Sequence, residues 1–94
     1  MDVKQPAVYI LASQKNGTLY VGVTSNLFQR IAQHKSGLVG KFTKYYACKF
    51  LVYYEYVGTM ADAIQREKYL KGKNRAFKID LIEQNNFEWR DLYG

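Results

Sequence analysis

The candidates for chemistry in this chain are two of its nine tyrosines, one of its four arginines, its one histidine and one of its eight acidic residues. In chain order they are Tyr9, Tyr20, Arg30, His34 and Glu67. A guanidinium can clamp a phosphate with two hydrogen bonds, an imidazole can relay protons near neutral pH, and a carboxylate can bind Mg²⁺. Each type also has an ordinary structural use, such as strand packing for tyrosine or an i,i+4 ion pair between Glu67 and Lys71. Residue type alone leaves both interpretations open.

The sequence lacks the residues for several other kinds of site. With one histidine and one cysteine, it cannot build a histidine-rich metal site or a thiolate zinc site. Residues 37–41 lack the spacing and the hydroxyl of a phosphate-binding glycine loop, and no nucleophile elbow is present. Cys48 has no partner for a disulfide, and we expect it to be a small, half-buried apolar residue.

A β-hairpin is predicted to carry the two tyrosines. Residues 8–11 and 18–21 are rich in β-branched and aromatic side chains, and Asn16-Gly17 between them is typical of a hairpin turn. Gly22 is expected to end the second strand.

A helix, a loop and a third strand are predicted to follow. The helix covers residues 27–36, with its N-cap among residues 24–26 and Gly37 just beyond its end. Arg30 and His34 lie one turn apart along its flank. Residues 38–49 are predicted to form an irregular basic loop, and residues 50–57 a strand apolar enough to be central in a sheet.

The remainder of the chain predicts two helices and a short tail. Thr59 caps a helix that residues 71–74 end, and Glu67 falls near the inward face of that helix. A further helix covers residues 75–84, and the aromatic side chains of the tail are expected to pack back. The order ββαβαα predicts an α+β fold, with a small three-stranded antiparallel or mixed sheet and flanking helices. Ninety-four residues make one domain, covering residues 1–94.

The basic excess is concentrated in the first half of the chain. The net charge is +6, and no acidic residue occurs between Asp2 and Glu55. The bases of this half are Lys4, Lys15, Arg30, Lys35, Lys41, Lys44 and Lys49. Phe42, Tyr45 and Tyr46 lie among the last three lysines, which is typical of a segment that meets a nucleic-acid backbone and an exposed base. The alternative is a basic domain with no particular partner.

The sequence predicts neither secretion nor membrane contact. The longest apolar run, residues 7–12, is far shorter than the roughly 20 residues of a membrane span. No basic region followed by a long hydrophobic stretch begins the sequence. We therefore expect a cytoplasmic protein.

Four segments form an ordered set across the chain. They are Ala7-Val8-Tyr9, Tyr20-Val21-Gly22, Asn26-Leu27-Phe28-Gln29-Arg30 with His34, and Ala63-Ile64-Gln65-Arg66-Glu67-Lys68. The first two resemble the paired motif that names the GIY-YIG nucleases. The third is similar to that family's helix with the catalytic arginine, and the fourth to its segment with a metal-binding glutamate. The tail from Asn86 resembles the end of small stand-alone bacterial members, which are often described as excinuclease-like endonucleases.

The resemblance implies an endonuclease that hydrolyses a DNA phosphodiester bond with water, using one Mg²⁺ or Mn²⁺ ion on Glu67. Arg30 would hold the phosphate, Tyr9 would be the general base, and Tyr20 would orient the phosphate. His34 would relay protons, orient Tyr9 or simply lie at the helix rim. Because tyrosine titrates near pH 10, a base needs nearby cations that lower its pKa, and the basic first half could provide that field.

The expected partner is DNA, without strong sequence specificity, because no recognition helix is evident. The expected DNA contacts are Lys15, Lys35, Lys41, Lys44, Lys49 and Asn86. Asn86 is matched to the family's late asparagine, with Asn85 as the alternative.

The sequence departs from the family pattern at two positions. Ala7 stands where glycine is usual, and Val23 stands where the repair-nuclease branch has a lysine, for which Lys15 or Lys35 could substitute. Two other functions remain open: a non-catalytic nucleic-acid-binding adaptor on the same scaffold, and a small structural or partner-binding domain.

Overall fold

The computed structural model describes residues 5–38 and 40–94. Residues 1–4 and Val39 lie outside the described residues, and with them the expectations for the start of the chain, for Lys4 and for one position of the predicted basic loop.

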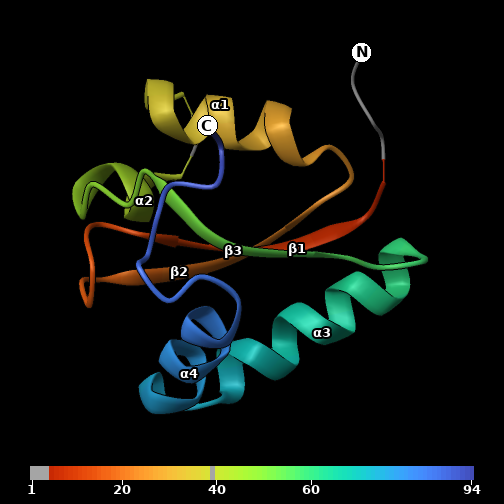
Figure 1. Ribbon diagram of the computed structural model, residues 1–94. Coiled ribbons are helices and arrows are strands. Elements are labelled where there is room, and N and C mark those ends of the chain that lie inside the picture. Colours follow the sequence, from red (N-terminus) through yellow and green to blue (C-terminus); the bar gives the residue numbers. More distant parts are fainter. Residues whose placement is uncertain (1–4, 39) are drawn as a thin grey trace.

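The described residues form an antiparallel three-stranded sheet, ordered β2-β1-β3, with helices on both faces (Figure 1). The strands are β1 (Ala7–Ala12), β2 (Leu19–Thr24) and β3 (Phe50–Tyr56). The helices are α1 (Leu27–Ser36), α2 (Lys41–Tyr45), α3 (Met60–Gly72) and α4 (Arg75–Asn85). The predicted α+β class and element order are confirmed, with the short α2 as an addition.

β1 is the central strand because its residues are apolar throughout. Helices cover both faces of the sheet, so all of Ala7–Ala12 is buried and no polar side chain alternates along it. The prediction that the strand at 50–57 would be central is wrong. β3 lies at an edge of the sheet, and Phe50 and Tyr56 at its ends are exposed.

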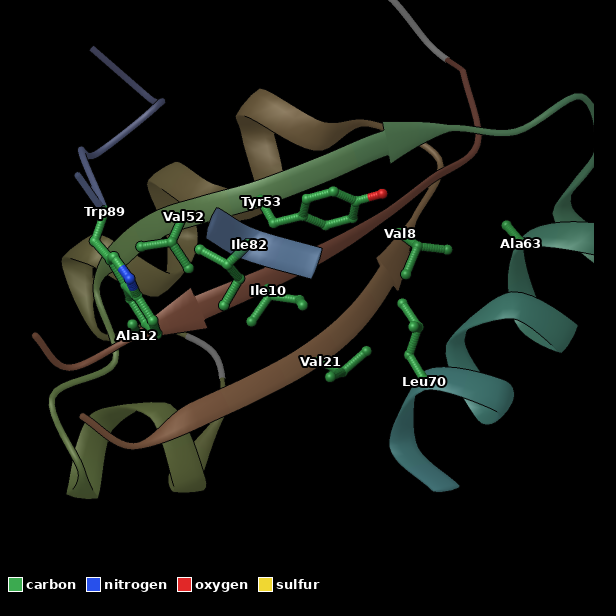
Figure 2. Close-up of a cluster of buried hydrophobic side chains, with 10 residues drawn as sticks. All are labelled: Val8, Ile10, Ala12, Val21, Val52, Tyr53, Ala63, Leu70, Ile82 and Trp89. Atoms are coloured by element: carbon green, nitrogen blue, oxygen red, sulfur yellow. The ribbon is translucent and has the colours of Figure 1, made fainter. Parts of the chain in front are cut away.

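Successive side chains of β1 enter two different cores. One core lies between the sheet and the α3–α4 pair, and Figure 2 shows its members around Ile10. They are Val8, Ile10, Ala12, Val21, Val52, Tyr53, Ala63, Leu70, Ile82 and Trp89. The other core lies beneath α1 and contains Ala7, Tyr9, Leu11, Leu27, Ile31, Cys48 and Leu51. Cys48 is completely buried there rather than half-buried as predicted.

The register of the hairpin places Gly22 directly opposite Tyr9. β2 continues through Gly22 to Thr24, so the prediction that this glycine ends the strand is wrong. The turn itself forms where it was predicted: Asn16 adopts φ 60°, and the backbone N–H of Ser13 donates to the Thr18 carbonyl at 3.0 Å.

α1 begins and ends with the predicted signals. The Asn26 side chain accepts a hydrogen bond from the Gln29 N–H, and Gly37 follows the last turn with φ 78°. The predicted basic loop is partly helical, because residues 41–45 form α2. The N–H of Lys44 donates to the Gly40 carbonyl at 3.0 Å, which starts this short helix.

α3 and α4 are capped by Thr59 and Asn74, whose side chains each accept a hydrogen bond from the backbone N–H three residues on. Their buried residues, Ala63, Leu70 and Ile82, belong to the core between these helices and the sheet. None of the helices in the described ranges is long and apolar enough to cross a membrane.

The tail covers the free edge of β3. The N–H of Leu92 donates to the Leu51 carbonyl at 2.7 Å, and the Leu51 N–H donates to the Asp91 carboxylate at 3.1 Å. Trp89 is buried, as predicted for the tail aromatics, whereas Phe87 is exposed. The edge of the sheet is thus protected by the chain's own end.

Candidate active site

Tyr9, His34 and Thr43 form a buried chain of hydrogen bonds. The Tyr9 hydroxyl lies 2.9 Å from Nε2 of His34, and Nδ1 of His34 lies 3.0 Å from Oγ1 of Thr43. The Thr43 hydroxyl donates to the Gly40 carbonyl at 3.0 Å. The three side chains come from β1, α1 and α2, which the sequence separates widely.

The position of the Tyr9 ring depends on Gly22. A Cβ at Gly22 would lie 2.3 Å from Cζ and 2.4 Å from the hydroxyl oxygen of Tyr9. The ring therefore lies directly over the backbone of β2, and only glycine leaves the space for it.

Aromatic rings continue from this point towards the surface. Tyr20 packs against Tyr9 and His34 with centroid distances of 6.4 and 5.6 Å. Phe42 of α2 lies 5.8 Å from Tyr20, and Tyr46 lies 4.7 Å from Phe42. Phe42 and Tyr46 are exposed, so the series runs from the buried hydrogen-bond chain out to solvent.

Arg30 and Glu67 act electrostatically on the same group. The Arg30 charge lowers the pKa of the Tyr9 phenol, while the Glu67 charge raises it. Arg30 also acts on His34. Both side chains are therefore within electrostatic range of Tyr9, although they come from helices on opposite faces of the sheet.

Burial is the main cause of the pKa shifts of Tyr9 and His34. It raises the pKa of Tyr9 above the usual tyrosine value, with Tyr20 adding to the rise. It lowers the pKa of His34 below the usual histidine value, with the Arg30 charge adding to the fall. Nearby cations were expected to lower the pKa of Tyr9; Arg30 does act in that direction, but burial outweighs it. At neutral pH, Tyr9 is a neutral phenol and His34 a neutral imidazole.

Glu67 fits a hydrated magnesium ion. Its side chain is 15% exposed, and Lys71, at 3.3 Å and half exposed, is its ion-pair partner. No group of three or more histidine, cysteine or acidic side chains able to share a metal occurs within residues 5–38 and 40–94. Because Mg²⁺ keeps several waters and needs only one or two protein carboxylates, the single carboxylate of Glu67 is a sufficient protein ligand for it.

The predicted DNA-contact lysines fall into separate places. Lys41, Lys44 and Lys49 are exposed, and the first two line a surface pocket with Gly37, Leu38 and Gly40. Lys15 lies in the hairpin turn, above the Phe87 ring. Lys35 forms an ion pair with Asp91 and donates to the Lys49 carbonyl. Its charge is thus neutralised within the chain, and we do not include it among the proposed contacts.

The Asn86 side chain forms its hydrogen bonds within the chain. Its side chain is buried and donates to the carbonyls of Val52 and Arg90, at 3.0 and 2.8 Å. It also accepts from the Arg90 N–H at 3.0 Å. The amide is used to join the tail to β3, whereas Asn85 is exposed.

Two residues of the site, Gly22 and Thr43, are not among the site residues predicted from the sequence. Gly22 is the glycine of the second motif, and its position two residues after Tyr20 could have indicated close approach of a ring. Thr43 had no such signal, because it lies in a five-residue helix inside the predicted loop.

Residues 5–80 match the family model of the GIY-YIG catalytic domain. The chain therefore belongs to the GIY-YIG domain family, a nuclease-type family.

Individual relatives are small proteins, since the matches cover nearly all of each. A UPF0213 protein of Syntrophus aciditrophicus is 40% identical over 79 residues, which is 83% of this chain and 90% of the relative. A UPF0213 protein of Staphylococcus haemolyticus is 38% identical over 77 residues, which is 82% and 93% of the two chains. The solution NMR structure of a UPF0213 protein from Bacillus halodurans is similar with a TM-score of 0.56 and 29% identity, covering 90% of this chain and 92% of that one.

Proposed function

We propose that this protein is a divalent-metal-dependent DNA endonuclease that hydrolyses phosphodiester bonds. The observation that carries the proposal is the buried hydrogen-bond chain from Tyr9 through His34 to Thr43, within electrostatic range of Arg30 and Glu67. Ordinary strand packing does not require a tyrosine hydroxyl to end on a histidine that a third side chain holds in place. Such an arrangement suits proton transfer from a polar substrate at the rim of the site.

Tyr9 and His34 act together as the base. The attacking water loses a proton to the Tyr9 oxygen, while the Tyr9 O–H proton passes to Nε2 of His34. Because burial raises the pKa of Tyr9, a stable phenolate is not available at neutral pH, so the two transfers are coupled. The net result is a hydroxide for the phosphorus and an imidazolium at His34.

Arg30 binds the phosphate and Tyr20 orients it. A guanidinium presents two parallel N–H donors to two phosphate oxygens, which neutralises charge that grows as the water attacks. The Tyr20 ring already packs on Tyr9 and His34, so its hydroxyl orients the phosphate relative to the base.

Glu67 would hold the metal. A bound Mg²⁺ or Mn²⁺ supplies Lewis acidity at the phosphate and stabilises the leaving oxygen. The Glu67 carboxylate, which pairs with the half-exposed Lys71 at 3.3 Å, would be the protein ligand of that ion.

The surface of α2 and of the segment that follows it, up to Lys49, is the proposed DNA-binding face. Lys41, Lys44 and Lys49 provide exposed positive charge, and the rings of Phe42 and Tyr46 lead from it to Tyr20. Backbone charge and ring stacking are both insensitive to sequence, so binding without strong sequence preference is expected.

A cleavage assay tests the proposal. The purified chain is incubated with single-stranded, flapped, branched and linear duplex DNA, with Mg²⁺, with Mn²⁺ or with a chelator. Cleavage of at least one substrate that requires the ion is expected. DNA binding without cleavage under any of these conditions would leave a non-catalytic adaptor, and the absence of both would leave a structural domain.

A further inference from the structure

We propose that Thr43 is a positioning residue, which holds the histidine of the site in the tautomer whose Nε2 accepts the proton of Tyr9. This inference deepens the proposed function and rests on it for its catalytic consequence. The tautomer itself can be measured in protein that cleaves nothing.

The direction of the hydrogen bonds follows from one carbonyl. The Gly40 carbonyl can only accept, and it accepts from the Thr43 hydroxyl at 3.0 Å as well as from the Lys44 N–H. With its own proton on the carbonyl, Oγ1 of Thr43 is left as the acceptor for Nδ1 of His34, and we assign the imidazole proton to Nδ1. In a neutral imidazole the other nitrogen is bare, so Nε2 accepts from the Tyr9 hydroxyl at 2.9 Å.

The packing around Thr43 supports a dedicated role. Its side chain is buried, with 1% of its surface exposed. Gly40 has φ 76°, and a Cβ there would lie 2.6 Å from Oγ1 of Thr43 and 3.2 Å from Cε1 of His34. The turn before α2 therefore approaches the threonine and the imidazole as closely as a glycine allows.

Among the described residues, no charged neighbour sets the tautomer in place of Thr43. The groups near the imidazole are Tyr9 from β1, Tyr20 from β2, Arg30 on its own helix and Thr43 from α2. Arg30 disfavours the imidazolium but does not choose between the two neutral forms. Thr43 is the group in contact with Nδ1.

The tautomer decides whether the proposed proton transfer can start. With Nδ1 protonated, the Tyr9 O–H bond breaks as an N–H bond forms at Nε2, and the Nδ1 proton stays on its bond to Thr43. With Nε2 protonated, the imidazole would donate to the Tyr9 oxygen and could not take its proton. Wrong-tautomer variants of other histidine relays lose activity for this reason.

The experiment uses the fact that the chain contains one histidine. Two-dimensional ¹⁵N NMR correlated to the ring protons shows directly which imidazole nitrogen carries hydrogen. The wild-type protein, metal-free and above the pKa of His34, is compared with Thr43→Val, which keeps the shape and removes the hydroxyl, and with Thr43→Ser, which keeps the hydroxyl.

The wild type and Thr43→Ser are expected to show Nδ1–H with a bare Nε2. Thr43→Val is expected to shift towards Nε2–H and, where cleavage is measurable, to slow it by about 10- to 100-fold while Thr43→Ser stays near wild type. A wild-type protein with Nε2–H overturns the proposal even if Thr43→Val does not fold, and so does an unchanged tautomer in folded Thr43→Val. If the expected NMR pattern is found in a protein that cuts no DNA, the role of Thr43 stands and only the nuclease function is contradicted.

Discussion

The geometry of the site depends on the missing side chain of Gly22 as well as on the hydrogen bonds of Tyr9, His34 and Thr43. The Tyr9 ring occupies the space above Gly22, and a methyl group there would overlap it. The geometry of the site is thus fixed in part by a side chain that is absent.

Gly22→Ala is expected to push the Tyr9 ring away from His34 and to lower the free energy of unfolding by about 1–3 kcal/mol, as overpacking does. Cleavage should fall with it. Gly58→Ala is the matched control, because no atom lies within 4 Å of the Cβ it would add and its backbone is not left-handed. Urea unfolding of both variants measures the effect. Equal stability of Gly22→Ala and wild type would mean that the ring is not held where the structure has it.

At this scale, the sequence could identify Tyr9, Tyr20, Arg30, His34 and Glu67 as candidates but could not supply their connections. The spacing of Arg30 and His34 followed from helical periodicity alone. The contact of His34 with Thr43 depends on how the chain folds between α1 and β3, where no periodic pattern exists. Likewise, Lys35 looked free in the sequence, because its partner Asp91 lies 56 residues further on.

Among the elements, the tail is joined to the sheet by several hydrogen bonds. It covers β3 through Asp91, Leu92 and Asn86. Burial alone would raise the pKa of Asp91, but hydrogen bonds from Lys35 and from the N–H groups of Tyr93 and Leu51 lower it. The ionised Asp91 carboxylate is thus stabilised by the folded chain, and the tail that carries it is packed as part of the domain.

Asn86→Ala would leave the buried Val52 carbonyl without its side-chain donor and would remove both links to Arg90. We expect a loss of about 1–3 kcal/mol in the free energy of unfolding. Asn85→Ala, next along the chain and exposed, should change it by less than about 0.5 kcal/mol. Chemical denaturation with a DNA-binding titration separates the roles: an Asn86→Ala protein of wild-type stability that binds DNA weakly would return Asn86 to the DNA contacts.

The element order was predictable because caps and turns are local signals, as at Asn16-Gly17, Asn26 and Thr59. The place of each strand in the sheet was not. β3 has the composition of a central strand, and only the tail explains why an edge strand can be so apolar.

Across the whole molecule, positive charge occurs on two sides of the sheet. α2 carries Lys41 and Lys44 near the candidate site, while α3 and α4, with their own lysines, cover the opposite face (Figure 1). The sequence located the basic excess in the first half of the chain, but only the fold distinguishes the face that adjoins the site.

DNA affinity should fall with salt as a straight line on logarithmic axes, with a slope near −0.9 for each phosphate contacted. Replacing Lys41, Lys44 and Lys49 by glutamine should flatten this slope by up to about 2.7, or about 0.9 for each lysine that contacts a phosphate. The control replaces Lys68 of α3, Lys73 just after α3 and Lys78 of α4 by glutamine. It changes the net charge by the same amount, but on other elements. Fluorescence anisotropy across a salt series measures both. Equal effects of the two triple variants would assign binding to overall charge rather than to α2.

Glu67 is proposed to hold a divalent ion for phosphodiester hydrolysis, and its replacement by glutamine tests this role. Single-turnover cleavage with Mg²⁺ is measured for wild type, Glu67→Gln and Glu88→Gln, with DNA affinity measured in parallel. Glu88 is the control because its side chain is 69% exposed and pairs with Arg90 in the tail.

Glu67→Gln is expected to lose at least about 100-fold in rate, since metal stabilisation of transition-state charge is worth several kcal/mol. Its DNA affinity should stay equal or rise slightly, because a negative charge near the phosphate is gone, and Glu88→Gln should behave as wild type. A Glu67→Gln protein that cleaves within a few-fold of wild type would show that Glu67 does not hold the metal and would contradict the account.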